Sequence, residues 1–201
     1  MSYVPVTVIV PFYEGHRFIE RAISSLERQS VLPREVVIVD DGSETRLESV
    51  ESEKISIRIV THDKQKGIPF ATNTGLQASS QTWISFLDQD DTWKEYKLER
   101  QWQAVKTRSD REDVIIGRIE EALPNGERVL KPRKKEIECL CRGPHTVRAL
   151  LTYGNIAPKA SLLLRRELAV SIGGFNEELQ GGADDYEFVV RLAAEGSRFL
   201  V

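Results

Sequence analysis

The feature that most constrains the fold is a series of continuous apolar runs in the first half of the chain. These runs, rich in β-branched residues, cover residues 6–12, 35–39, 57–60 and 83–87. Because their apolar residues are continuous rather than alternating, they predict strands buried on both faces of a sheet. Segments with helical spacing lie between them, at residues 16–29, around Leu47 and Val50, and at 69–79. The alternation predicts an α/β, Rossmann-like fold, with a mostly parallel central sheet flanked by helices.

The second half of the chain is less regular. Its pattern predicts strands at residues 114–119, 128–130 and 161–164, and helices at 146–153, 165–172 and 184–194. A basic stretch at 131–135 is expected to be a loop. A chain of 201 residues, 40% of them hydrophobic, suits one domain, residues 1–201. Because residues 199–201 form an apolar run, we expect the chain to be truncated at its C-terminus, as a fragment of a longer protein.

Composition excludes several classes of protein. The net charge is −3, and no basic face is evident, so nucleic acid is not an expected partner. No apolar stretch reaches the ~20 residues of a transmembrane helix. Cys139 and Cys141 lie near His145, but three ligands at irregular spacing are a weak zinc signal, and ordinary reduced thiols are the preferred interpretation. A cytoplasmic location follows as the default.

An acidic turn follows the fourth predicted strand. Asp88, Asp90 and Asp91 place three carboxylates within four residues, where they repel one another unless a cation is present. Carboxylate oxygens suit Mg²⁺ or Mn²⁺, and such a metal is usually held by one or two carboxylates together with substrate phosphates. The turn therefore predicts a shared metal and diphosphate site. The alternative is an acidic cap on a helix that starts near Trp93.

Polar residues also follow the first and second predicted strands. Tyr13 and Glu14 come after the first, and Asp40 and Asp41 end the second, before a glycine and a serine. Ligands of doubly wound sheets bind beyond the carboxyl ends of the strands, so we expect these residues to converge with the acidic turn. Tyr13 could stack on a nucleobase, and an aspartate could bind a base or ribose, although packing and turn formation would use the same residues. The chain contains no P-loop.

A third acidic segment begins the last predicted helix. Asp184 and Asp185 follow two glycines at the helix start, where the helix dipole favours negative charge. Simple N-capping would explain the pair. A functional interpretation is that one carboxylate faces a substrate hydroxyl as a general base.

Taken together, five segments in this order resemble the family 2 glycosyltransferases of the GT-A fold. The segments are VTVIVPFYEG, EVVIVDDGS, KGIPFATNTGLQAS, FLDQDDTW and GGFNEELQGGADDYEFVVRL. The fourth is similar to the family's Asp-x-Asp metal motif, and the last to its Gly-Gly-Phe stretch and acidic motif. The resemblance covers essentially the whole chain. It implies a nucleotide-binding half at residues 1–108 and an acceptor-side half at 109–201.

The resemblance also implies a reaction and a set of site residues. Enzymes of this family move a sugar from a nucleoside-diphosphate sugar to an acceptor hydroxyl, usually with inversion. A UDP-sugar is the favoured donor, a glycan or lipid-linked molecule the acceptor, and Mn²⁺ or Mg²⁺ the cofactor, with peripheral association at the inner face of the membrane. Asp185 would be the catalytic base. Asp90 and Asp91 would serve the metal, with Asp91 the favoured direct ligand. The implied donor-binding residues are Pro11, Tyr13, Glu14, Asp40, Asp41, Asn73 and Asp90.

The sequence departs from the family pattern at several positions and leaves two alternatives open. Glu14 stands where asparagine is usual, Thr72 where a basic residue is common, and Asp184 where glutamate is usual. One alternative is a haloacid-dehalogenase-like phosphatase with Asp88 as nucleophile, although that motif normally ends the first strand of its domain. The other is a nucleotide-sugar-binding module without turnover.

Overall fold

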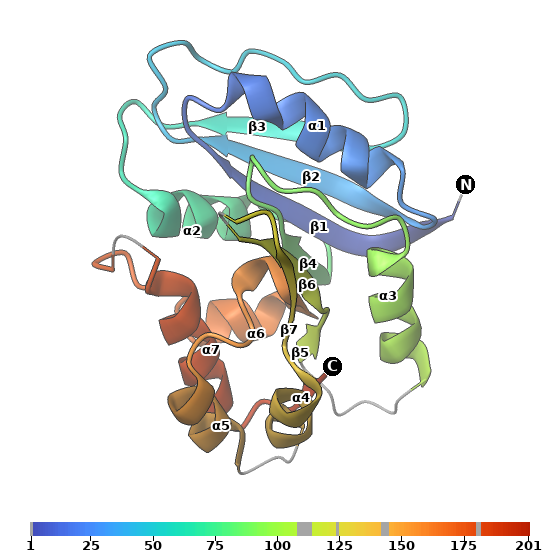
Figure 1. The fold of residues 1–201 in the computed structure, drawn as a ribbon. Helices are drawn as coiled ribbons and strands as arrows, with labels where there is room; N and C mark the ends of the chain where they lie inside the picture. Colours follow the sequence, from blue (N-terminus) through green and yellow to red (C-terminus); the bar gives the residue numbers. More distant parts are fainter. Residues whose placement is uncertain (1, 108–113, 124, 142–144, 180–181) are drawn as a thin grey trace.

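A seven-stranded sheet forms the centre of the computed structural model, which describes residues 2–107, 114–123, 125–141, 145–179 and 182–201 (Figure 1). The strand order is β3-β2-β1-β4-β8-β5-β9. The strands are β1 (Tyr3–Phe12), β2 (Leu32–Asp40), β3 (Ser56–Thr61), β4 (Trp83–Phe86), β5 (Val114–Ile116), β8 (Leu162–Arg165) and β9 (Phe199–Leu200). Strands β6 (Ile119–Ala122) and β7 (Arg128–Lys131) form a separate antiparallel hairpin.

The direction of the strands places the polar segments together. Strand β1 pairs in parallel with both β2 and β4, and β2 pairs in parallel with β3. Only β8 runs against its neighbours in the described sheet, since it is antiparallel to both β4 and β5. The predicted mostly parallel sheet is confirmed. The carboxyl ends of β1, β2 and β4 therefore meet at one edge.

Helices cover both faces of the sheet, as continuous apolar strands require. On one face Val8 and Val10 of β1 pack with Ile23 of α1 (His16–Glu27), and α3 (Lys97–Thr107) covers the same side. On the other face Ile9 packs with Leu76 of α2. The helices of that face are α2 (Ile68–Ala78), α5 (Thr146–Tyr153), α6 (Arg166–Ser171) and α7 (Asp184–Ala194), and Leu140 at the end of α4 (Lys134–Leu140) belongs to the same core cluster. No helix among the described residues combines the length and apolar character needed to cross a bilayer.

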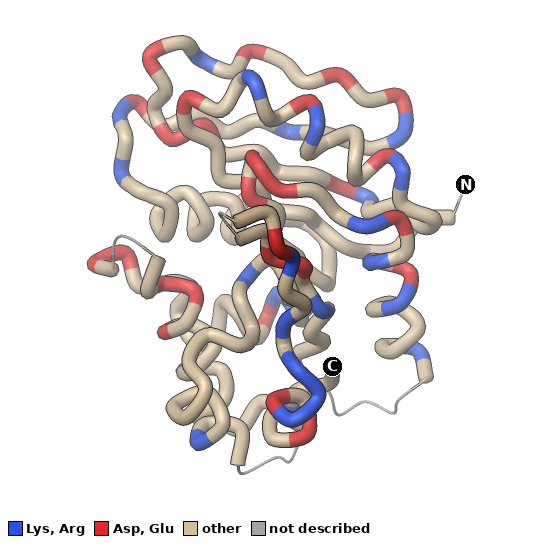
Figure 2. The backbone as a smooth tube through the Cα atoms, in the orientation of Figure 1, with Lys and Arg blue, Asp and Glu red and all other residues tan. Residues whose placement is uncertain are grey.

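Four predicted elements differ from those observed. The short helix expected around Leu47 is absent from residues 41–55, because the Leu47 amide donates instead to Asp40. The single strand predicted at 114–119 is two strands in different sheets, separated where the Gly117 amide donates to the Ser161 carbonyl. The helix expected near Trp93 begins at residue 97, and the expected basic loop at 131–135 runs into helix α4 (Lys134–Leu140). Figure 2 shows the lysines and arginines gathered from β7 into α4.

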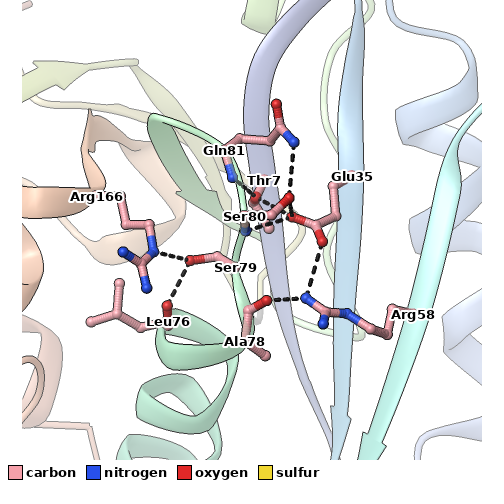
Figure 3. A network of polar contacts seen from close by, with 9 residues as sticks. All are labelled: Thr7, Glu35, Arg58, Leu76, Ala78, Ser79, Ser80, Gln81 and Arg166. Carbon is pink, nitrogen blue, oxygen red and sulfur yellow. Dashed lines mark hydrogen bonds and ion pairs between the residues drawn. The ribbon is translucent and has the colours of Figure 1, made fainter.

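The carboxylate of Glu35 ties the sheet to the end of α2 (Figure 3). One oxygen accepts from the Thr7 hydroxyl at 2.6 Å and from the Ser80 amide and hydroxyl at 2.9 Å each. The other accepts from Arg58 at 3.0 Å, and the same guanidinium contacts the Ala78 carbonyl. Burial by itself would raise the pKa of Glu35, but these hydrogen bonds outweigh it and hold the pKa below its ordinary value. The network stabilises the end of the sheet that lies opposite the polar segments.

Candidate active site

The polar segments that follow β1, β2 and β4 meet, as the sequence predicts. The side-chain amide of Gln89 accepts from the Tyr13 N–H at 2.9 Å and donates to the Tyr13 carbonyl at 3.1 Å. The Glu14 N–H donates to the Ser43 hydroxyl at 3.0 Å. At residue 15, a glycine, a Cβ would lie 2.1 Å from the Gln89 side-chain oxygen, so the glycine leaves room for this contact. The three strand ends are thus joined by hydrogen bonds.

The residues after β1 differ in exposure. Pro11 is buried within β1, whereas Tyr13 leaves 38% of its surface exposed at the edge of the sheet. Glu14 has a φ of 48°, a left-handed conformation that is strained for a residue with a side chain. Its carboxylate accepts from the Glu44 amide at 2.6 Å, which binds the loop after β2 to the turn after β1. The exposed Tyr13 ring is the surface that a planar ligand can reach.

The two aspartates at the end of β2 are buried and are held by hydrogen bonds from the chain itself. Asp40 accepts from the Ser43 amide at 3.0 Å and from the Leu47 amide at 2.9 Å, one with each oxygen. Burial alone would raise the pKa of Asp40, but these amides hold it below its usual value. Asp41 accepts from the Gly67 amide at 2.7 Å. Direct contact between either carboxylate and a ligand would compete with these bonds.

A histidine that the sequence does not single out holds Asp41 from the other side. His62 Nδ1 lies 2.7 Å from Asp41 Oδ1, and His62 Nε2 lies 2.9 Å from the Thr74 hydroxyl. The His62 and Asp41 side chains are 7% and 5% exposed. The contact fixes the loop between β3 and α2 against the end of β2. No sequence motif signals it, because the partners come from separate elements.

Asn73 links α2 to the loop before α7. Its side-chain oxygen accepts from the Phe175 amide at 2.8 Å, and its nitrogen donates to the Phe175 carbonyl at 2.8 Å. Gly174 has a φ of 71°, and a Cβ there would lie 2.4 Å from the Asn73 oxygen. This explains the Gly-Gly-Phe sequence in local terms. The Asn73 amide is engaged with the chain itself, so a donor contact by Asn73 stays a prediction.

The acidic turn lies between β4 and α3. Asp90 and Asp91 are exposed, and Arg21 donates to the Asp90 carbonyl at 2.6 Å. Partial desolvation, followed by repulsion from Asp88 and Asp90, raises the pKa of Asp91. This turn is red in Figure 2. Its negative charge is not fully compensated, which is the electrostatic condition that favours binding of a cation.

Asp88 has a partner that the sequence does not indicate. Lys159 Nζ lies 2.8 Å from Asp88 Oδ1, and the lysine side chain is only 7% exposed. Lys159 begins the short helix η2 (Lys159–Ser161), which leads into β8 beside β4. The lysine therefore reaches the acidic turn through the sheet pairing rather than through proximity in sequence.

The acidic pair at the start of α7 lies at the same site. Asp185 Oδ2 accepts from the Asn155 side chain at 3.0 Å and from the Lys159 amide at 3.4 Å. Asp185 Oδ1 and Asp184 Oδ2 are buried atoms without a hydrogen-bond partner in the described structure. Burial raises the pKa of Asp184, Lys159 opposes that rise, and Asp185 and Asp88 add to it. A carboxylate oxygen that accepts no hydrogen bond from the chain still has lone pairs with which it can take a proton from a bound hydroxyl.

The site can supply only some of the oxygen ligands that a divalent cation needs. Among the described residues there is no group of three or more His, Cys, Asp or Glu side chains placed to hold a metal. Asp90 and Asp91 are nevertheless exposed carboxylates, and Mg²⁺ and Mn²⁺ commonly bind one or two such groups plus phosphate oxygens and water. The residues fit a metal that a bound diphosphate completes.

Comparisons with known proteins identify the family of the chain. The family model described as glycosyl transferase family 2 matches residues 7–169. A Haemophilus influenzae protein named as an uncharacterized glycosyltransferase is 23% identical over 96% of this chain and 63% of its own length. An Escherichia coli protein, UDP-Glc:alpha-D-GlcNAc-diphosphoundecaprenol beta-1,3-glucosyltransferase WfgD, is 37% identical over 48% of this chain and 39% of its own. The chain thus spans less than two thirds of the length of either relative.

Solved structures share the fold. Staphylococcus aureus TarS 1–349 in complex with UDP has a TM-score of 0.76 at 21% identity, covering 99% of this chain and 57% of that one. The mannosyltransferase PcManGT from Pyrobaculum calidifontis, in complex with GDP-Man and Mn²⁺, has a TM-score of 0.70 at 22% identity, covering 98% and 54%. The phosphatase alternative is not supported, since the family match differs and Asp88 follows β4 rather than β1.

Proposed function

Because the chain belongs to glycosyl transferase family 2 and has the GT-A fold, we propose that it carries the donor and catalytic site of an inverting glycosyltransferase. The substrate would be a nucleoside-diphosphate sugar, with a UDP-sugar favoured, and the acceptor a hydroxyl of a glycan or lipid-linked molecule. Residues 1–108 would bind the nucleotide and 109–201 would face the acceptor. A cytoplasmic location at the inner face of the membrane stays a prediction from the sequence.

One observation carries the proposal. The same site contains the exposed carboxylates of Asp90 and Asp91 and the Asp185 oxygen that has no hydrogen-bond partner. Lys159 joins the two segments, because its side chain contacts Asp88 in the acidic turn and its backbone N–H donates to Asp185 at the start of α7. A group transfer of this kind needs a cationic element at the leaving diphosphate and a base at the acceptor. The site offers a place for each.

The proposed donor contacts follow from exposure. Tyr13 offers an exposed ring to the nucleobase at the edge of the sheet. Pro11 and Glu14 shape the turn beneath it, and Asp90 is placed to contact the ribose or the metal. Contacts by Asp40 and Asp41 remain part of the proposal, although both carboxylates also hold the loop that follows β2.

The proposed reaction is a single displacement. Mn²⁺ or Mg²⁺ bound at Asp90 and Asp91 would neutralise charge on the departing diphosphate. Asp185 accepts the proton of the acceptor hydroxyl as that oxygen forms its bond to the anomeric carbon. The bond between this carbon and the diphosphate oxygen breaks on the opposite face, so the configuration inverts. Although an aspartate with an ordinary pKa of ~3.9 is a weak base, it needs to accept the proton only as the new bond forms.

Calorimetry with UDP tests the donor site. We expect UDP to bind far more tightly with Mn²⁺ than with EDTA, and Asp91→Ala to abolish the difference. Glu138→Ala, which removes one negative charge from an exposed position of α4, is the control and should retain the difference. Equal affinity of the unmodified chain with and without metal would count against the assignment.

A second measurement separates an enzyme from a binding module. UDP release from UDP-sugars, with water or added glycans as acceptor, should be detectable and should depend on Asp185. Metal-dependent UDP binding without any release from a panel of UDP-sugars would instead favour the non-catalytic module.

A further inference from the structure

Lys159 is unusual among the cations of this chain. Among the described lysines and arginines it has the least exposed surface, 6%, and Lys97 of α3 is another that is largely removed from water. Lysine is almost never fully buried without a partner, because removing an ammonium from water is costly. Lys159 Nζ contacts Asp88 Oδ1 at 2.8 Å, and Asp88 is 37% exposed. The pair therefore joins a buried ammonium to a carboxylate at the rim of the site.

The ammonium acts on both acidic segments. In the acidic turn Lys159 contacts Asp88 directly, and its positive charge also attracts Asp91, three residues further along. At the start of α7 the same charge attracts Asp184. The residues around this one amine thus include Asp88 and Asp91 from the acidic turn and Asp184 from α7.

The position of the ammonium is set by the backbone rather than by a flexible loop. Lys159 lies in η2 directly before β8, and β8 pairs with β4, whose end leads into Asp88. The Lys159 N–H also donates to Asp185 Oδ2 at 3.4 Å. The backbone of Lys159 is therefore held beside the acidic turn by the sheet and by this hydrogen bond.

We infer that Lys159 is a resident counter-ion that competes with the divalent metal for Asp88. In this arrangement Asp88 is withheld from the metal, only Asp90 and Asp91 remain available, and the diphosphate of the donor completes the coordination. Lys159 is thus a positioning residue that makes metal binding depend on the donor. The inference rests on the proposed function, because it assumes that the acidic turn binds a divalent cation.

Binding of Mn²⁺ alone, measured by electron paramagnetic resonance, tests the inference. Lys159→Met removes the competing charge at similar length, so Mn²⁺ should bind about tenfold more tightly than to the unmodified chain. Lys159→Gln, which is neutral but polar, should gain affinity in the same direction and serves if the methionine variant folds poorly. Lys94→Met removes a charge from a side chain that is 79% exposed and pairs with Glu120, and should change Mn²⁺ affinity by less than about twofold.

A double variant identifies the carboxylate that is released. In Asp88→Asn combined with Lys159→Met, the gain in Mn²⁺ affinity should disappear, because the freed carboxylate is no longer present. A folded Lys159→Met or Lys159→Gln protein that binds Mn²⁺ no more tightly, or a gain that persists in the double variant, overturns the inference. Those results leave the proposed function standing if the unmodified chain binds UDP in the presence of Mn²⁺, whereas failure of that binding counts against the proposed function itself.

Discussion

The side-chain amide of Gln89 is hydrogen-bonded to both backbone polar groups of Tyr13, at 2.9 Å from the nitrogen and 3.1 Å from the oxygen. The amide thus pairs with Tyr13 much as a neighbouring strand would, at a point where β1 and β4 have both ended. It joins the acidic turn to the residue that we propose to contact the nucleobase. The geometry of the acidic turn therefore depends on a residue within it that carries no charge.

The contact between Gly15 and Gln89 is testable by a double-mutant cycle. A Cβ at residue 15 would lie 2.1 Å from the Gln89 oxygen, so Gly15→Ala should displace the amide and lower the free energy of unfolding by about 1–3 kcal/mol. In a Gln89→Ala background the same change should cost less than about 0.5 kcal/mol. Urea denaturation of the four proteins measures both values. Equal costs in the two backgrounds would show that the alanine disturbs something else.

Variants of Tyr13 and Asp40 should distinguish a residue that binds UDP from a residue that stabilises the fold. Tyr13→Ala removes an exposed ring, so the free energy of unfolding should change by less than about 0.5 kcal/mol while UDP affinity falls about tenfold. Asp40→Asn directs an amide toward a backbone N–H that needs an acceptor, so it should destabilise the fold by about 1–3 kcal/mol. Thermal melting and calorimetry on both variants decide the matter. A Tyr13→Ala protein that melts early but binds UDP normally would contradict the proposed stacking.

Asp185 and Asp184 should differ in their effect on turnover. Asp185→Asn should preserve UDP affinity and reduce UDP release by roughly 10²–10⁴-fold, because it removes the open acceptor and little else. Asp184→Asn should reduce UDP release by less than about tenfold. If Asp184→Asn loses turnover and Asp185→Asn keeps it, the base is Asp184.

Asp184→Asn should also stabilise the fold at neutral pH. Because the pKa of Asp184 is raised in the folded state, its charged form is disfavoured there, and stability is lost as the pH rises through the folded pKa. The asparagine removes this loss, so the melting temperature at pH 7 should stay equal or increase. A lower melting temperature would mean that the attraction of Lys159 for the Asp184 carboxylate outweighs the desolvation of that carboxylate.

Glu35 should stabilise the fold in a pH-dependent manner. Its folded pKa is lowered from 4.5, so its contribution is present above that pH and is lost as the pH falls through the folded pKa. Glu35→Gln should therefore reduce the free energy of unfolding by about 1–3 kcal/mol at pH 7, and by progressively less below about pH 4.5. Denaturation at several pH values measures the difference. A constant difference between the two proteins would exclude the carboxylate charge as its cause.

Lys97 should also make stability increase with pH, but over a higher pH range than Glu35. Burial lowers its pKa to about 7, and its amine donates to Gln101 at 2.8 Å while lying 3.7 Å from the centre of the Trp93 ring. The folded state disfavours the charged amine, so the cost is largest below pH 7 and diminishes as the pH rises toward the ordinary lysine pKa of ~10.4. Lys97→Met should raise the melting temperature more at pH 6 than at pH 9. Lys106→Met, at an exposed position of the same helix, should show no such difference.

The sequence by itself determined the parallel core of the sheet and the edge at which the acidic residues lie. Continuous apolar runs predict β1 to β4 because a strand covered on both faces must be apolar on both faces. Because these strands are parallel, the residues after β1, β2 and β4 lie at the same edge of the sheet, independently of which side chains they carry. The same reasoning failed for residues 41–55, because Asp40 engages the amides that a helix would use.

Only the tertiary structure decided which side chains meet at that edge. Lys159 reaches Asp88 through the pairing of β8 with β4, His62 reaches Asp41 from β3's end, and Asn73 binds a backbone segment 102 residues away. Periodicity reports which residues of one segment are buried, but it contains no information about the distance between segments. The charge that each carboxylate carries is set by such distant partners and by desolvation, so the electrostatics of this site are a property of the folded chain.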